Sequence, residues 1–281
     1  MIKKVGIAYH PLNTKVPEVT KMLTTVLRDC HLEIWQCSAW DVHKLSQYLC
    51  NTDFILTVGG DGTILRVAQV LDGLPIPIAG INLGQLGFLT ELPPVDFNDK
   101  LQALLDGKGW NDERAMMDIT LQQAENGTIR TQQFHALNDV VMARGAIARI
   151  VEVTASVDGA IIDTYKADGA LVASATGSTG YALAAGGPIL NPKSSDLLLV
   201  PILPHISLNY PLVLDSASTI MLKLSTTSPS TLSIDGHISL ELFNGSIITV
   251  SSSSKRTTFL RLDPPNYFYT SLGKKLRRTA I

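Results

Sequence analysis

An aspartate surrounded by glycines is the first place in the chain where residue types suggest chemistry. The stretch from Thr57 to Leu65 reads TVGGDGTIL, and in it an apolar run meets glycines on both sides of Asp61 before a helical pattern begins. Glycines at a helix start let backbone N–H groups approach phosphate oxygens, and the helix dipole favours the negative charge. A carboxylate beside phosphate is unfavourable unless it holds Mg²⁺ or takes a proton from an attacking hydroxyl. The turn therefore favours phosphoryl transfer.

The alternative for this turn is purely structural. Asp61 would then cap the helix, which is worth about 1 kcal/mol, and the glycines would only make the bend. The pattern is neither a Walker loop nor GxGxxG, so it matches neither of those nucleotide-binding motifs. Arg66 follows Asp61 by about one and a half helical turns and could reach phosphate, although a solvated surface arginine is the alternative. The residues expected at a phosphate are Gly59, Gly60, Gly62 and Thr63.

A second unusual stretch, residues 167–192, reads ADGALVASATGSTGYALAAGGPILNP and is rich in small and hydroxyl residues with almost no charge. Such residues permit a tight bend with close backbone approach, and Ser178, Thr179 and Tyr181 would offer hydroxyls to a polar ligand. A buried seam of small residues is the alternative. Asp168 opens the stretch in an Asp-Gly pair, for which a turn is the usual explanation.

The segment HALNDVV sets Asn138 and Asp139 among apolar neighbours. Unpaired polar groups at such positions would cost a few kcal/mol if they were buried. An adjacent amide and carboxylate suit the hydroxyls of a ribose, whereas two turn residues of a hairpin would explain the pair equally well. The residues alone leave this choice open.

The type of secondary structure that the sequence predicts around these residues changes along the chain. Up to about residue 90, short apolar strands alternate with amphipathic helical segments, which predicts an α/β domain with a mainly parallel sheet. From Arg114 the pattern becomes period-two and β-rich, with Asn-Gly and Asp-Gly turn signals. We expect an α/β nucleotide-binding domain over residues 1–100, a β-rich, β-sandwich-like domain over 101–255, and a tail, 256–281, that packs back on the first domain.

Composition limits the class of protein. A length of 281 residues exceeds a typical domain of roughly 100–200 residues, and a hydrophobic content of 45% with 17% charged residues excludes a disordered or fibrous chain. The formal charge of −2 gives no reason to expect nucleic-acid binding. Three cysteines without metal-type spacing are read as reduced thiols. Without a secretory signal or a run of about 18 apolar residues, we expect a soluble, cytoplasmic protein that does not bind membranes.

Taken together, these segments resemble the NAD kinase family. GGDGTIL resembles its nucleotide motif, GINLGQLGFLTEL the loop that follows, ALNDVV its Asn-Glu motif, and ADGALVASATGSTGYALAAGGPIL its glycine-rich signature. LPHISLNYPLVL and LSIDGH match further segments, so the likeness runs in order from about residue 55 to about residue 240. GGDG alone is shared with lipid kinases and phosphofructokinases, whereas the combination is specific.

The resemblance implies an NAD kinase/diacylglycerol kinase-like fold and phosphorylation of the 2′-hydroxyl of the adenosine ribose of NAD to give NADP. Asp61 would be the catalytic base, and Asn138 with Asp139 would hold the ribose. The implied NAD-binding set comprises Asp61, Gly62, Arg66, Asn138, Asp139, Arg149, Lys166, Asp168, Thr176, Thr179, Gly180, Tyr181, Ala182, Leu183, Ala184 and His237. Two positions depart from the family pattern, because Asp139 replaces a glutamate and Gly180 replaces an alanine.

The resemblance also implies ligands and partners. ATP or polyphosphate would be the phosphoryl donor, a divalent metal ion such as Mg²⁺ would assist without a fixed set of protein ligands, and the enzyme would be a homo-oligomer, dimer or tetramer, with shared active sites. Two alternatives remain open on the sequence: a lipid kinase of the same superfamily, and a non-catalytic NAD(P)-sensing module. The signature TGSTGYALAAGGP and the intact Asp61 argue for the NAD kinase.

Overall fold

The chain divides into two compact units in a computed structural model that describes residues 2–84, 87–93, 97–125, 127–146, 149–205 and 210–279. The first unit comprises Met1–Glu113 and Thr257–Ile281, and the second comprises Arg114–Arg256. Parts of two motif segments, residues 85–86 of GINLGQLGFLTEL and 206–209 of LPHISLNYPLVL, lie outside the described residues, as does Asn126 of the Asn-Gly turn signal.

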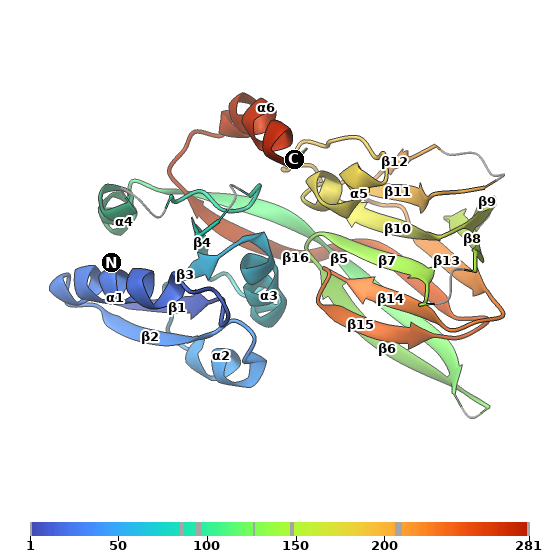
Figure 1. The fold of residues 1–281 in the computed structure, drawn as a ribbon, viewed down its shortest axis with the longest axis horizontal. Coiled ribbons are helices and arrows are strands. Elements are labelled where there is room, and N and C mark those ends of the chain that lie inside the picture. The colour runs from blue at the N-terminus through green and yellow to red at the C-terminus, as the bar shows by residue number, and fades with distance from the viewer. Residues whose placement is uncertain are drawn as a thin grey trace. The chain divides into compact units, whose positions relative to one another are not determined.

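The first unit is an α/β unit in which helices pack against a parallel sheet (Figure 1). Its strands lie in the order β2-β1-β3-β4-β16, and the end of β16 pairs in parallel with β4 through Phe259 and Ile78. The strands are β1 (Lys4–Tyr9), β2 (Glu33–Ser38), β3 (Phe54–Gly59), β4 (Ile78–Asn82) and the last residues of β16 (Ile247–Arg261). The helices are α1 (Val16–Asp29), α2 (Val42–Tyr48), α3 (Asp61–Leu71), α4 (Phe97–Leu105) and α6 (Tyr267–Thr279).

Apolar spacing explains how the helices of this unit attach to the sheet. In α1, Val16, Val19, Leu23 and Leu27 recur at helical spacing, and all are buried against one face of β1 and β3. Helix α4 joins the same core cluster through residues such as Phe97. Strand β3 is buried along its whole length, as expected for a strand of a parallel sheet that is covered on both faces.

The glycine turn connects β3 to α3 directly. Gly59 ends the strand, Gly60 has extended backbone angles (φ −112°, ψ −171°) as the N-cap residue, and Asp61 is the first residue of the helix. Helix α3 then buries apolar residues such as Ile64 and Val67, which fixes its start against the end of β3. The local pattern of strand, glycines and helix predicted from the sequence is therefore the observed one.

The second unit contains two antiparallel sheet systems (Figure 1). In one, β8 lies between β9 and β13, β13 pairs with β16, and β5 pairs with β6 as a hairpin. The other has the order β12-β11-β10-β7-β14-β15. The elements are β5 (Trp110–Glu125), β6 (Thr128–Ala136), β7 (Asp139–Arg144), β8 (Val151–Val157), β9 (Ala160–Ala167), β10 (Gly169–Ser174), η1 (Gly177–Thr179), α5 (Tyr181–Ala184), β11 (Leu197–Ile202), β12 (Leu212–Leu214), β13 (Ile220–Ser225), β14 (Ser230–Ile234) and β15 (Ile238–Leu242).

One apolar core joins these two sheets. Residues at alternate positions, such as Val151 and Val153 of β8 and Val140 and Met142 of β7, are buried in the same cluster. The predicted fold class, an α/β unit with a mainly parallel sheet and a β-rich, sandwich-like unit, is therefore confirmed. Within the described residues, none of the helices is both long and apolar enough to cross a membrane.

Candidate active site

Asp61 does not cap helix α3. The N-cap position belongs to Gly60, and the Asp61 carboxylate instead accepts three backbone hydrogen bonds from a loop that follows β4. The donors are the N–H of Phe88 to Oδ2 at 2.8 Å, and those of Leu89 and Thr90 to Oδ1 at 3.1 and 3.2 Å. The cap that the sequence offered as an alternative is therefore wrong, and the carboxylate is fixed by tertiary contacts.

The geometry of these bonds leaves one part of the carboxylate available. An ionised carboxylate has about four lone-pair positions. Oδ1 accepts two of the three bonds and Oδ2 accepts one, and Asp61 is only half-buried. Oδ2 can therefore accept one more hydrogen bond, which is what a base needs in order to take a proton from a hydroxyl.

The loop that holds Asp61 is itself anchored by a buried charge network. Nη1 of Arg261 donates to the carbonyl of Leu89 at 2.6 Å, and Nε lies 3.4 Å from Oδ2 of Asp112. Nη1 also lies 3.6 Å from Oε2 of Glu91, whose Oε1 accepts the N–H groups of the two residues after Arg261 at 2.7 and 2.8 Å. The segment that begins at Arg261 therefore supports the backbone whose N–H groups bind Asp61.

The glycine turn has room beside it. A Cβ placed on Gly60 or Gly62 would meet no atom within 4 Å, so internal packing does not require glycine at either position. Thr63 is 1% exposed, and its hydroxyl has no hydrogen-bond partner within the described residues. Open space and an unsatisfied hydroxyl are what a phosphate site needs at this turn. Arg66 lies over the ring of Trp40, 4.3 Å from its centroid, so its guanidinium is held on the flank of the turn.

In the second unit, two segments of the predicted set come together. The backbone of Gly177 lies so close to Asn138 that an added Cβ would overlap its carbonyl, and a Cβ on Gly180 would lie 3.6 Å from Nδ2 of Asn138 and 3.8 Å from Oδ2 of Asp139. Oδ1 of Asn138 and the hydroxyl of Thr176 are both buried without a hydrogen-bond partner in the described part of the chain. Buried polar atoms normally have partners, so these two indicate a ligand site.

The next residues of the implied NAD-binding set lie in the short helices η1 and α5. Thr179 donates its hydroxyl to the carbonyl of Thr176 at 3.2 Å, and Tyr181 is exposed at the start of α5. Ser178 differs from the expectation, because it is buried and its hydroxyl is used inside the loop, with Ala175 and Leu190. In α5, Ala182 is buried, Leu183 is half-buried and Ala184 is exposed.

Asp168 lies at the other end of the same strand pair. In the register of β7 and β10, Asp139 faces Ala173, whereas the N–H of Arg144 donates to the carbonyl of Asp168. The five steps along the strand from Asp139 to Arg144 span roughly 17 Å. Asp168 forms an ion pair with Arg144 at 2.7 Å, so it is oriented by a cation of its own sheet.

Three basic residues of the implied NAD-binding set, Arg149, Lys166 and His237, lie in the second unit. Lys166 is exposed and pairs with Glu152 at 3.2 Å, and Arg149 is exposed. His237 is half-buried, and its Nδ1 lies 3.1 Å from the carbonyl of Asp235. Of the three, only His237 is connected by described contacts to the Asn138 segment, and the connection passes through Asp235.

Asp235 is the residue that sequence reasoning missed. Its carboxylate is buried, with 5% of the residue exposed, and accepts hydrogen bonds from the N–H groups of Leu137, Asn138 and Asp139. The only signal in the sequence was the Asp-Gly pair in LSIDGH, which reads as an ordinary hairpin turn. The backbone of Phe88, Leu89 and Thr90 was missed for a similar reason, since N–H donors are not visible as residue types.

Two buried carboxylates lie together here. Burial and then the charge of Asp235 raise the pKa of Asp139 to about 7. Burial also raises the pKa of Asp235, to about 6, although its three backbone N–H donors act in the opposite direction. The two groups titrate as a pair, and Asp139, whose carboxylate accepts no hydrogen bond within the described residues, is the one that keeps its proton more easily.

This pair predicts how stability depends on pH. The unfolded chain loses the Asp139 proton near the ordinary pKa of 3.8, whereas the native chain keeps it to about 7. The native state therefore binds more protons at Asp139 between these values, and the contribution of this group to the free energy of unfolding falls as pH rises from about 4 to about 7. Thermal unfolding from pH 5 to 8 should show Asp139→Asn gaining melting temperature relative to wild type as pH rises. Asp118→Asn, at an exposed position, is the control and should not gain melting temperature in this way. A pH-independent difference between Asp139→Asn and wild type would contradict the prediction.

The close approach at Gly177 predicts a second effect. Gly177→Ala would drive a Cβ into the backbone of Asn138, which cannot move without disturbing the loop. Gly180→Ala is the matched control, because its Cβ would come no nearer than 3.3 Å to any atom. We expect Gly177→Ala to weaken NAD binding at least tenfold and Gly180→Ala to stay within about threefold, as measured by titration calorimetry. Equal affinities in the two variants would show that the approach is not needed.

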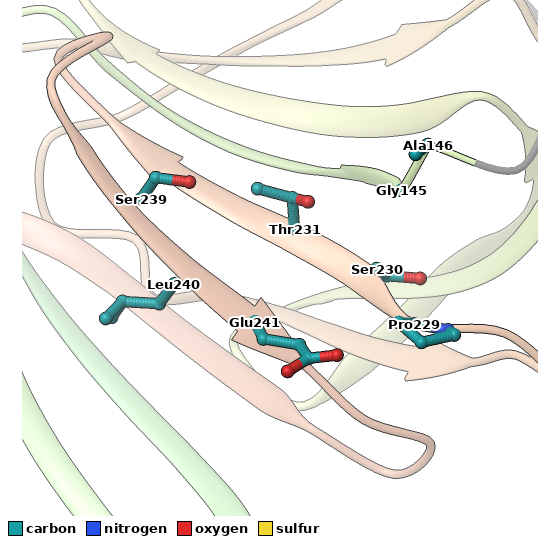
Figure 2. Close-up of a pocket in the computed structure, with 8 residues that line it drawn as sticks. All are labelled: Gly145, Ala146, Pro229, Ser230, Thr231, Ser239, Leu240 and Glu241. Carbon is teal, nitrogen blue, oxygen red and sulfur yellow. The ribbon is translucent and has the colours of Figure 1, made fainter.

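A shallow hollow of about 450 Å³ elsewhere in the second unit is not this site (Figure 2). It lies over β14 and β15 and is lined by residues such as Thr231, Ser239 and Leu240, none of which belongs to the predicted set. The ionisable residue among those lining it is Glu241, whose carboxylate would repel a phosphate. The unsatisfied groups around Asn138 and Thr63 are therefore better indicators of ligand binding than this hollow.

Comparison with known proteins divides the chain into the same two parts. Residues 39–109 match the ATP-NAD kinase N-terminal domain, and residues 137–262 match the ATP-NAD kinase C-terminal domain. A protein named NAD kinase from Dehalococcoides mccartyi (strain CBDB1) is 46% identical over 277 residues, which cover 99% of this chain and 97% of that protein. Another NAD kinase, from Chloroflexus aggregans, is 36% identical over 99% of this chain and 100% of its own length.

Two solved structures of kinases are also similar to this chain. Yeast NADH kinase complexed with NADH aligns with a TM-score of 0.86 at 24% identity, over 98% of this chain and 87% of that chain, which supports the fold alone. An NAD kinase from Archaeoglobus fulgidus in complex with ATP aligns with a TM-score of 0.77 at 28% identity, over 97% and 98%. The fold and the matched domains define the chain as a nucleotide-binding phosphotransferase. It belongs to the NAD kinase family.

Proposed function

We propose that the chain transfers the γ-phosphoryl group of ATP to the 2′-hydroxyl of the adenosine ribose of NAD, which gives NADP and ADP. The observation that carries the proposal is Asp61, an acid at a glycine turn whose carboxylate is fixed by three backbone donors and retains a free acceptor position. The ATP bound to the Archaeoglobus fulgidus relative supports ATP as the donor.

The reaction assigns a simple role to Asp61. Its Oδ2 accepts the proton of the 2′-hydroxyl while the ribose oxygen forms a bond to the γ-phosphorus, and the bond from that phosphorus to the ADP oxygen breaks. The backbone bonds from Phe88 to Thr90 prevent the carboxylate from turning away during this step. Positioning of this kind supplies most of the catalysis in phosphoryl transfer, because little covalent chemistry is required of the protein.

Groups of the second unit would bind the dinucleotide. Asn138 and Asp139 would hold the ribose, and the buried, unsatisfied Oδ1 of Asn138 supports this role. Asp168 lies roughly 17 Å from Asp139 along the strand pair and would also line the dinucleotide site. The rest of the proposed contacts are Gly62, Arg66, Arg149, Lys166, Thr176, Thr179, Gly180, Tyr181, Ala182, Leu183, Ala184 and His237, with Gly59, Gly60, Gly62 and Thr63 at phosphate.

We propose Mg²⁺ as the accompanying ion. In the described ranges, no group of three or more His, Cys, Asp or Glu side chains is placed to hold a metal. Mg²⁺ usually keeps several waters and binds through substrate phosphates with one or two carboxylates, so the phosphates of ATP would supply part of its ligands. When bound to ATP, the ion would neutralise negative charge on the phosphates.

We also propose that the enzyme is a cytoplasmic homo-oligomer. Support for self-association comes from the edges of the second unit's sheets, where Ile161 on β9 is 72% exposed and Val213 on β12 is 51% exposed. Apolar side chains on edge strands are a typical feature of surfaces that pair with another chain. Light scattering coupled to gel filtration gives the size of the assembly.

A coupled assay tests the proposed function. The purified chain is incubated with NAD, ATP and Mg²⁺, and NADP is measured with an NADP-specific dehydrogenase. We expect NADP to form in proportion to enzyme, and diacylglycerol in place of NAD should not be phosphorylated. Binding of NAD without NADP formation, with ATP or polyphosphate and with several metals, would instead support a sensing module.

A further inference from the structure

The hairpin turn between β14 and β15 carries a buried acid that the reaction itself does not use. Asp235 and Gly236 both have left-handed backbone angles, with φ of +48° and +67°. Among residues with a side chain, Asn and Asp adopt such angles most readily. An asparagine could therefore make the same turn without burying a charge, so the turn alone does not explain the carboxylate.

The hydrogen bonds of Asp235 explain why a carboxylate is buried at this turn. Oδ2 accepts the N–H of Leu137 at 2.9 Å, and Oδ1 accepts those of Asn138 and Asp139 at 2.7 and 3.1 Å. The N–H of Asp235 donates in return to the carbonyl of Asp139 at 2.9 Å. Only a carboxylate presents two acceptor oxygens to three successive N–H groups, because an amide would turn a donor toward one of them.

The other side of this loop is held by Ser174. Its hydroxyl donates to the carbonyl of Leu137 at 2.5 Å, and its N–H donates to the carbonyl of Asn138 at 2.9 Å. Each backbone N–H and C=O group of residues 137–139 therefore has a partner on Asp235 or Ser174. The side-chain Oδ1 of Asn138 has none within the described residues. The backbone is fixed while the side chain is left available.

We propose that Asp235 is a positioning residue, which fixes the backbone of residues 137–139 so that the side chains of Asn138 and Asp139 are set for the ribose of NAD before it binds. This inference rests on the proposed function, because it needs Asn138 and Asp139 to contact that ribose. Pre-organisation of this kind raises affinity by removing the entropic cost of ordering the loop on binding.

The test is Asp235→Asn, which keeps the turn and removes one acceptor. We expect the KM for NAD to rise roughly tenfold, since a hydrogen bond to a charged group is lost, while the KM for ATP stays within about twofold. Hydrogen exchange should show faster exchange at the amides of residues 137–139. Asp158→Asn is the matched control, because Asp158 also has a positive φ (+50°) before a glycine and accepts one backbone N–H, from Thr219. It should change neither KM.

Ser174→Ala is the second variant if Asp235→Asn does not fold. It removes the hydroxyl that binds the carbonyl of Leu137 and accepts the N–H of Gly177, and it keeps the backbone N–H that binds the carbonyl of Asn138. It should raise the KM for NAD in the same selective way. A folded variant that melts at a lower temperature but keeps its KM for NAD would assign Asp235 a structural role only, and would overturn the inference. Failure of the wild-type chain to form NADP would instead overturn the proposed function, so the two failures are distinguishable.

Discussion

Asp61→Asn should lower the turnover of NAD by roughly 10²–10⁴-fold, the usual contribution of a positioned general base, and leave NAD binding nearly unchanged. An amide cannot take the 2′-hydroxyl proton at neutral pH. Its oxygen can still accept the N–H groups of Leu89 and Thr90 if it occupies the place of Oδ1. The measurement is kcat for NADP formation, together with the dissociation constant of NAD from calorimetry.

Asp72→Asn is the matched control, because Asp72 lies at the other end of the same helix, is exposed, and has a positive φ that asparagine also adopts. Its turnover should equal that of wild type. If Asp61→Asn kept near-normal turnover, the general base would have to be another residue. If it lost NAD affinity in parallel with turnover, Asp61 would be a binding group and the assignment of its role would be wrong.

Arg261→Met should destabilise the chain by about 3–5 kcal/mol, the usual cost of removing one partner from a buried ion pair. The side chains of Arg261, Glu91 and Asp112 are 8%, 8% and 4% exposed, so the variant would remove the Arg261 cation from two buried carboxylates. The carbonyl of Leu89 would also lose its donor. Urea unfolding followed by circular dichroism measures the change in the unfolding midpoint.

The control is Arg28→Met, the same change at an exposed position in the last turn of α1. It should stay within about 0.5 kcal/mol of wild type. Because the loop at Leu89 also supplies N–H donors to Asp61, Arg261→Met should lower kcat as well, at temperatures where the variant is folded. Equal unfolding midpoints for the two variants would show that the network contributes little.

The sequence predicted the parts of the fold that depend on local pattern. The alternation of buried strands and amphipathic helices gave the parallel sheet of the first unit, and the glycine turn before α3 was placed correctly. The period-two pattern from Arg114 onward predicted the strands of the second unit, although it did not show that β6 ends at Ala136 and that β7 begins at Asp139. The break falls at Leu137 and Asn138, where the backbone bonds to Asp235 and Ser174 in place of continuing the strand.

The sequence predicted only those site residues whose side-chain type itself suggests a chemical role. Asp61, Asn138 and Asp139 have residue types that suggest bases or ribose ligands, and Thr176 was included through resemblance. The groups that orient them were not predictable, because they are backbone N–H donors or residues distant in the sequence. Asp235 is 97 residues from Asn138, and Arg261 is 172 residues from Leu89. Such pairs are created by tertiary folding, and no local pattern in the chain encodes them.

Strand β16 begins in the second unit and ends in the first, which affects the order in which contacts can form during synthesis. The second unit is one continuous segment, Arg114–Arg256, whereas the first needs residues from both sides of it. During translation the ribosome releases Arg261 only after the whole second unit has been made. Because domains generally fold as units in the order in which they emerge, the loop around Asp61 would gain its Arg261 anchor late. A released chain that lacks residues 257–281 would still contain Asp235 and Ser174 beside the ribose segment, whereas the loop around Asp61 would lack Arg261.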